Sequence, residues 1–141
     1  MYDGTNYLVT WLDQRSGRKR ISGRRVTPAG TLLDGPGTSD GIAIDESNHQ
    51  PTMFDVRFDG DEYVIVGAGY EGIFVRRLSP AGLLVDGTPE EGGVLIAAPG
   101  EANVYPLVPT ISGIGSRSFV AWVHAPFFAD EELRGVTYYS D

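Results

Sequence analysis

The sequence predicts an all-β protein built from a repeated unit of about four short strands. Its 141 residues include 19 glycines, about twice the average share, which indicates many tight turns. Glycine and proline interrupt the chain too often for a helix of three turns, and no segment has helical periodicity. A chain of this length suits one ordinary domain with a sizeable core.

The first repeated feature is an Asp-Gly turn followed by a short apolar strand. It occurs at residues 2–11, recurs at 58–67 and returns in altered form at 114–122. The spacing is regular, because Tyr7 and Tyr63 are 56 positions apart. Asp-Gly pairs are typical of hairpin turns, so each copy predicts a hairpin that leads into the apolar strand.

The second repeated feature is a proline-containing turn. Residues 27–35 read Thr-Pro-Ala-Gly-Thr-Leu-Leu-Asp-Gly, and residues 79–87 repeat this pattern as Ser-Pro-Ala-Gly-Leu-Leu-Val-Asp-Gly. The hydroxyl can bond to nearby backbone, proline presets φ, and glycine supplies a positive φ. The pattern therefore predicts a tight hairpin between an arginine-containing strand and a leucine-rich one. A further apolar strand follows each copy, at 41–44 and at 93–96.

The central strands of the repeat are apolar at consecutive positions, as at 7–9, 63–66 and 119–122. A sheet with one wet face would alternate apolar and polar residues, so these strands predict sheets covered on both faces. A period near 50, four strands in each period and doubly buried strands together favour β-propeller blades.

The combined pattern resembles the blade repeats of large secreted or surface proteins from bacteria, over nearly the whole chain. The resemblance implies four-stranded antiparallel blades and a secreted or cell-surface location. We assign residues 1–48 to a blade without its first strand, 49–103 to a complete blade and 104–141 to a blade without its last strand. These amount to about two and a half blades, whereas a closed propeller needs about four to eight.

The incomplete count leaves three explanations open: a fragment of a longer chain, copies that combine into a closed ring, or blades that stack without closing. Open apolar blade faces promote aggregation. We therefore expect self-association, or missing blades of a parent chain, to cover them. The first residues predict a turn and a strand rather than a signal peptide. The sequence leaves open whether a leader that preceded them was removed.

Composition excludes several classes of function. The net charge of −8 argues against nucleic acid as a partner. No apolar run approaches the roughly 20 residues that span a membrane, and the absence of cysteine excludes disulfides and thiolate zinc sites. Six of the eleven basic residues nevertheless gather in one short stretch, either as a solvated hairpin loop or as a patch for an anionic ligand or partner: Arg15, Arg18, Lys19, Arg20, Arg24 and Arg25.

The candidate ligand-binding residues are Trp11, Asp13 and Trp122. The two tryptophans occupy equivalent positions of the repeat, with Gly67 at that position in the middle copy. A tryptophan near a blade end can stack on a sugar ring, and Asp13 follows Trp11 by two positions. The alternative is that each large ring fills the wedge between adjacent sheets, and its recurrence favours this interpretation.

Metal and catalytic signals are weak. Asp59 and Asp61 are the least poor calcium candidates, but the loop lacks the D-x-D-x-D-G pattern, and Asx turns explain its carboxylates more simply. His49 and His124 stand at non-equivalent positions without convergent partners. The loop with Phe127 and Phe128 is a possible contact for a partner or for its own sheet. We expect no cofactor and no metal.

The arginine pairs at 24–25 and 76–77 admit two interpretations, a carboxylate clamp or packing at strand ends. Taken together, the sequence predicts a non-enzymatic scaffold or binding module that uses loops at the blade ends. A lectin-like propeller that binds carbohydrate is the first alternative, and a protein ligand is also open. The second alternative is part of a glycosidase whose catalytic residues lie in missing blades.

Overall fold

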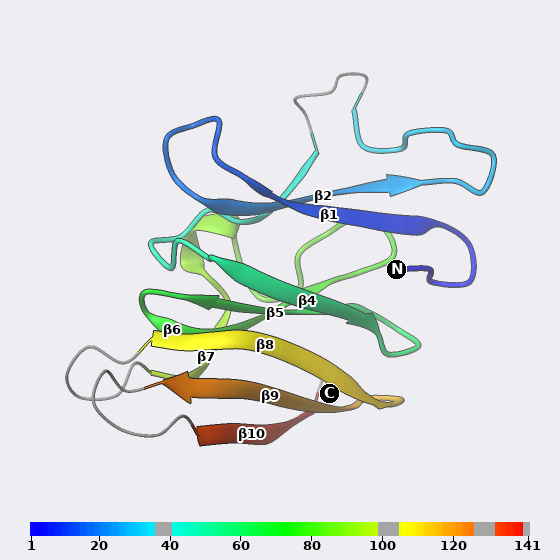
Figure 1. The fold of residues 1–141 in the computed structure, drawn as a ribbon. Coiled ribbons are helices and arrows are strands. Elements are labelled where there is room, and N and C mark those ends of the chain that lie inside the picture. The colour runs from blue at the N-terminus through cyan, green and yellow to red at the C-terminus, as the bar shows by residue number, and fades with distance from the viewer. Residues whose placement is uncertain (36–40, 99–104, 126–131, 140–141) are drawn as a thin grey trace.

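The computed structural model describes residues 1–35, 41–98, 105–125 and 132–139, and these residues form an all-β fold of three antiparallel sheets (Figure 1). The first sheet contains β1 (Tyr7–Asp13), β2 (Arg20–Val26) and β3 (Ile42–Asp45). The second contains β4 (Met53–Phe58), β5 (Tyr63–Gly69), β6 (Gly72–Leu78) and β7 (Val94–Ala97). The third contains β8 (Tyr105–Ile114), β9 (Arg117–Ala125) and β10 (Glu132–Tyr139). The predicted all-β class is confirmed.

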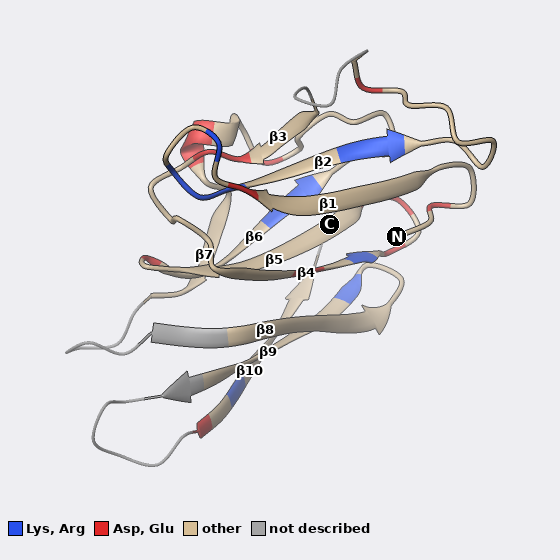
Figure 2. Ribbon diagram, turned by 45° about the horizontal axis from the view of Figure 1, so that its top comes forward, with Lys and Arg blue, Asp and Glu red and all other residues tan. Residues whose placement is uncertain are grey.

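Each sheet is a meander in which sequence neighbours pair, and the second sheet has the order β4-β5-β6-β7. A short 3-10 turn, η1 (Pro89–Glu91), precedes β7. The sheets lie one above another as layers, with the second in the middle (Figures 1 and 2). Within the described residues the three sheets do not close into a ring.

The Asp-Gly turns form as the sequence predicts. Asp3 Oδ1 accepts the backbone N–H groups of Thr5 and Asn6, both at 2.7 Å. In the second copy, Asp59 Oδ1 accepts the backbone N–H groups of Asp61 and Glu62 at 2.9 and 2.8 Å. The glycine after each aspartate has a positive φ, 97° at Gly4 and 116° at Gly60, which other residues adopt only with strain.

The proline-containing turns also recur in both copies. Thr27 Oγ1 and Ser79 Oγ each accept the backbone N–H four residues later, at 3.0 and 3.2 Å. The leucine-rich segments that follow form single bridges, at Leu32 and Leu84, instead of the predicted strands. The strand that pairs with β2 is β3, and the strand that pairs with β6 is β7.

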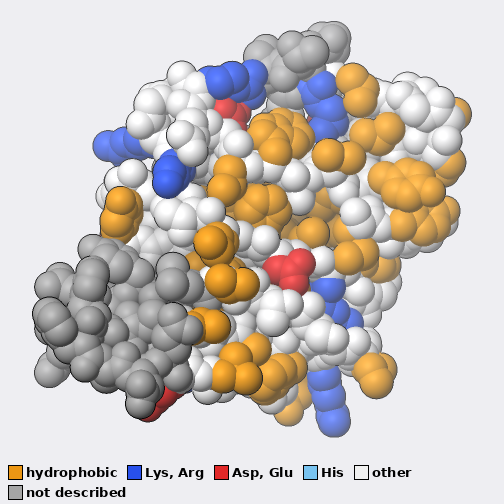
Figure 3. Space-filling model, in the orientation of Figure 1, with side chains coloured by type: hydrophobic (Ala, Val, Ile, Leu, Met, Phe, Trp, Pro, Cys, Tyr) orange, Lys and Arg blue, Asp and Glu red, His pale blue; other side chains and the backbone are white. Residues whose placement is uncertain are grey.

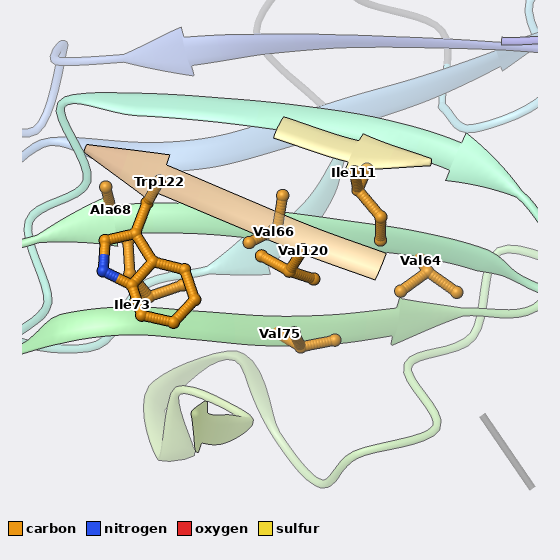
Figure 4. Packing of buried hydrophobic residues seen from close by; sticks show 8 residues of the cluster. All are labelled: Val64, Val66, Ala68, Ile73, Val75, Ile111, Val120 and Trp122. Carbon is orange, nitrogen blue, oxygen red and sulfur yellow. The ribbon is translucent and has the colours of Figure 1, made fainter. Parts of the chain in front are cut away.

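The core consists of two clusters, one on each side of the second sheet. Leu8, Ile21 and Ile44 of the first sheet pack against Tyr63, Phe74 and other residues of the second. The cluster on the opposite side joins the second sheet to the third, through Val64, Val66, Ala68, Ile73, Val75, Ile111, Val120 and Trp122 (Figure 4). Every residue of β5 is buried, as expected for a sheet covered on both faces.

Polar bonds link the layers as well. Tyr63 donates from its hydroxyl to Asp3 Oδ2 of the first layer at 2.7 Å. Toward the third sheet, Arg57 donates to Ser118 Oγ at 2.6 Å, and Asp55 Oδ2 accepts the backbone N–H of Ile111 at 3.0 Å. These bonds set the sheets in one register, because each requires a particular alignment of its two strands.

Candidate functional site

The two repeat-equivalent tryptophans lie in different environments. Trp122 is only 7% exposed and lies beside Ala68 and Ile73 between the second and third sheets (Figure 4). Trp11 lies on the opposite face of β1 from Leu8, which packs toward the second sheet, so Trp11 faces away from the core. The structure therefore does not bring the two rings together, and Trp122 has the wedge position expected for packing.

The equivalent position of the second sheet is Gly67, and an aromatic ring from the neighbouring strand takes its place. Phe74 pairs with Gly67 across β5 and β6, and a Cβ on Gly67 would lie 2.2 Å from the Phe74 ring. Phe74 also stacks on His49 with ring centroids 4.3 Å apart. Sequence reasoning missed Phe74, although a glycine where both other copies carry tryptophan was a signal that something else fills the space.

Asp13 is enclosed by donors from its own hairpin. Its carboxylate accepts bonds from Arg15 Nε at 3.0 Å, from the Arg15 backbone at 2.9 Å and from Arg20 Nη2 at 3.1 Å. These bonds, those from Arg15 first, hold the pKa of Asp13 well below its usual range. A carboxylate satisfied in this way positions the β1–β2 hairpin, and its role as a ligand-binding residue stays a prediction.

Within the described part of the chain, three of the six basic residues form ion pairs with carboxylates of their own neighbourhood, and Arg15 and Arg20 both pair with Asp13. Arg20 also pairs with Glu46, and Arg25 pairs with Asp34 at 2.7 Å. This bond helps to lower the pKa of Asp34 against the raising effect of its burial, the largest single influence. The second copy repeats the arrangement, since Arg77 pairs with Asp86 at 2.8 Å. These pairs support the strand-end interpretation, because each arginine meets an aspartate of the turn segment that follows its own strand.

A small pocket lies beside the hairpin loop and has a volume of about 180 Å³. Its lining combines cations, a hydroxyl and one carboxylate: Ser16, Arg18, Lys19, Arg20 and Glu46. Arg18 donates to Asn48 Oδ1 at 3.1 Å, which holds its guanidinium at the surface. The arrangement can bind a small anionic group such as a carboxylate or sulfate.

A buried arginine connects the first and second sheets. Arg76 is 0% exposed, and its burial lowers the pKa of its guanidinium. It donates to three backbone carbonyls, from Nε to Ile44 at 2.9 Å, from Nη1 to Asp86 at 3.0 Å and from Nη2 to Thr88 at 2.7 Å. The Ile44 bond crosses from the second sheet to the first, so this cation is a structural link.

A polar group at the same junction contains aspartate, serine and histidine. Asp45 Oδ1 accepts the Ser47 hydroxyl at 2.8 Å, and His49 Nδ1 lies 3.5 Å from the same oxygen. His49 Nε2 faces Glu71 at 3.4 Å. The Ser47 hydroxyl donates its hydrogen bond to Asp45 and not to the His49 imidazole. The three side chains therefore lack the nucleophile–base geometry of a hydrolase triad. Sequence reasoning missed Asp45 here; the run of polar residues at 45–49 was the available signal.

The calcium candidates lie in a tight turn. Both backbone donors of the Asp59 turn point to its Oδ1, and Asp61 is exposed. Across the described part of the chain, no group of three or more histidine, aspartate or glutamate side chains converges to hold a metal ion. Phe127 and Phe128 lie outside the described residues, as does the side chain of His124.

The outermost faces of the stack carry exposed apolar side chains. On the first sheet, Tyr7 is 46% exposed and Val9 51% exposed. On the third sheet, Phe119 and Leu133 are exposed on the face that points away from Trp122. Figure 3 shows hydrophobic side chains at several places on the side of the molecule that it presents. None of the helical residues described forms a span long and apolar enough to cross a membrane.

Comparisons with protein-family models, with curated proteins and with solved structures give no match for this chain.

Proposed function

We propose that this chain is a non-enzymatic segment of β-propeller-type blades, which serves as a scaffold or binding module of a larger secreted or surface protein. The observation that carries the proposal is the repetition of one interface between successive sheets. Each four-stranded or three-stranded sheet is then one blade, and the chain contributes one whole blade and parts of two others.

Equivalent positions occupy equivalent places in both interfaces. Leu8 and Ile21 of the first sheet face the second, and their counterparts Val64 and Ile73 face the third. The receiving side is also repeated, because Ile65 packs toward the first sheet and Val120, at the same position of the repeat, packs toward the second. A unit that meets each neighbour in the same way is the physical basis of repeat architectures.

The scaffold role follows from where the side chains are used. Both faces of the middle sheet are occupied in packing, and the buried charges Arg76 and Asp13 are bonded within the fold. The loops at the ends of the sheets remain available for binding. Proteins with a rigid scaffold commonly bind their partners through such loops.

The proposal is tested by adding one period of the repeat inside the chain. A second copy of residues 49–103 is inserted after residue 103, and the same residues in shuffled order are inserted as the control. We expect the lengthened chain to fold cooperatively with a higher free energy of unfolding, because one more interface is added. Hydrogen exchange that finds the insert unprotected while the rest stays folded would contradict a repeat.

The proposal that the chain is not an enzyme is tested separately. A panel of chromogenic glycosides is incubated with the original chain and with the lengthened chain, and product release is followed by absorbance. We expect no turnover in either case. Turnover that copurifies with the folded protein would instead favour the glycosidase interpretation.

The pocket beside the β1–β2 loop favours a second candidate, lectin-like binding of an acidic saccharide. Arg18 and Lys19 supply cations that no carboxylate neutralises among the described contacts. An array of neutral, uronic-acid and sulfated saccharides tests this, with Lys19→Ala and the matched control Arg134→Ala on the distant β10. Binding of acidic saccharides that only Lys19→Ala weakens supports the candidate, and silence of the array counts against it.

A further inference from the structure

At the contact between the first and second sheets, an arginine side chain bonds to the backbone of the neighbouring sheet. The first sheet carries an arginine at the equivalent position of the repeat. Arg76 on β6 sits opposite Ile65 of β5, and its Nε donates to the backbone carbonyl of Ile44 on β3 at 2.9 Å. β3 is the last strand of the preceding sheet. The bond therefore joins Arg76 to the edge strand of the first sheet.

Arg24 is the residue at the same position of the first sheet. It lies 52 positions before Arg76 and sits opposite Val9, the counterpart of Ile65. Arg24 is only 7% exposed, yet its Nε and Nη2 have no hydrogen-bond partner among the described residues. Its unpaired Nε is the same atom that reaches across to the neighbouring sheet in Arg76.

Buried N–H groups without an acceptor are unfavourable, because they have lost water without gaining a hydrogen bond. The residues around Arg24 also lack the cover that their counterparts have. Tyr7 and Val9 are about half exposed, whereas Tyr63 and Ile65 are fully buried against the first sheet. The outer face of the first sheet thus carries the same kinds of residue as the face of the second sheet that packs on the first. Among the described residues, no sheet packs against it.

We propose that this outer face receives a further complete blade of the same repeat, whose last strand offers a backbone carbonyl to Arg24 Nε as Ile44 does to Arg76. The inference rests on the proposed function. A second copy of the chain fits less well, because the open face it can present belongs to the third sheet, where the described residues form β8, β9 and β10 and no fourth strand carries the acceptor.

The test supplies that blade at the amino terminus. One period, residues 49–103, followed by residues 49–57, is joined to Tyr2 in place of Met1. This gives a spacing of 55 residues between the added copy and the first, the same as between Ile65 and Val120 of the second and third copies. Trp122→Phe makes Trp11 the only tryptophan, since the added residues contain none. We expect acrylamide to quench Trp11 several-fold less in the extended chain than in the original chain with the same substitution.

The second measurement isolates Arg24. In the original chain, Arg24→Met leaves the thermal midpoint unchanged or raises it, because two buried N–H groups without an acceptor among the described residues are removed. In the extended chain the same substitution lowers the midpoint by about 3 °C, because it breaks a bond between blades. Arg76→Met in the original segment is the matched control and lowers the midpoint in both chains.

Several results would overturn the proposal. One is equal quenching of Trp11 in both chains, and another is an equal effect of Arg24→Met in both. A third is an extended chain that aggregates although the internal insertion after residue 103 folds; if neither folds, the proposed function itself fails. A fourth is sedimentation of the original chain as a dimer that Val9→Lys dissociates, since a second copy would then cover this face.

Discussion

Gly67 and Phe74 face each other across β5 and β6, and the phenylalanine ring occupies the space that a side chain at residue 67 would need. The first sheet has the reverse arrangement, with Trp11 opposite Ser22. One large ring and one small residue therefore share this position in both sheets, although different strands supply the ring. The Phe74 ring lies between the first and second sheets, so a side chain at residue 67 would compete with it for the same space.

This relationship predicts strong coupling between residues 67 and 74. Gly67→Ala should lower the free energy of unfolding by about 1–3 kcal/mol through overpacking, and Phe74→Ala by about 3–5 kcal/mol through the cavity it leaves. Gly67→Trp combined with Phe74→Ser rebuilds the pair of the first sheet and should recover part of the loss. Urea unfolding of the single and double variants forms the cycle, and additive effects would exclude the shared-space explanation.

The two tryptophans should report their different environments. Trp11→Phe leaves Trp122 as the only tryptophan, and its emission should be blue-shifted and protected from acrylamide because the ring is buried between sheets. Trp122→Phe leaves Trp11, which should emit further to the red and be quenched more strongly. The assignment of Trp122 to the wedge fails if both variants give the same quenching constant.

Asp13 should make stability dependent on acid. Its pKa is lower in the folded chain than in the unfolded chain, chiefly because of its bonds from Arg15, so the folded state binds the proton more weakly. The stabilisation is present above the ordinary aspartate pKa of about 4 and is lost as the pH falls below it. Asp13→Asn should flatten the fall in unfolding free energy between neutral and acidic pH. Asp61→Asn, an exposed carboxylate, is the control and should leave the slope unchanged.

Tyr63 should make stability dependent on base. Burial, together with its hydrogen bond to Asp3, raises the pKa of Tyr63, so the folded chain holds the phenolic proton more tightly than the unfolded chain. This stabilisation is complete below the ordinary tyrosine pKa of about 10 and is lost as the pH rises above it. Urea titrations at neutral and alkaline pH should give a smaller loss for Tyr63→Phe than for the original chain. The exposed Tyr139→Phe should behave like the original chain, and an equal change in both variants would rule out the assignment to Tyr63.

The turns could be predicted from sequence because their chemistry is local. Asp3 bonds the backbone two and three residues ahead, and Thr27 bonds the backbone four residues ahead. The positive φ of Gly4 and Gly60 follows from the same few residues. The leucine-rich segments were predicted less well, because whether Leu32 forms a strand or a single bridge depends on which neighbour already pairs with β2.

The candidate site was only partly accessible to sequence reasoning. Trp11 and Trp122 were recognised as equivalent, but equivalence in the repeat does not tell which of them has a neighbouring sheet. Asp13 stood out beside Trp11, yet its enclosure by Arg15 and Arg20 depends on the path of the hairpin loop. His49 was considered from the sequence, but its partners were missed, because its contacts with β6 and with Glu71 form only in the folded chain.

The sequence by itself determined the all-β class and the Asp-Gly and proline-containing turns, since these rest on residue composition or on bonds within a few positions. The apolar runs predicted strands covered on both faces, which is confirmed for β5 and wrong for β1 and β9, where Tyr7, Val9 and Phe119 are exposed. Only the tertiary structure decided that Arg76 is bonded across to Ile44 while Nε of Arg24, in the same motif, has no partner among the residues that the structure describes. It also decided that Phe74 replaces a tryptophan in the wedge. The physical reason is that face-to-face packing joins residues far apart in the chain, so the same local sequence is satisfied where a neighbouring sheet is present and open where none is packed against it.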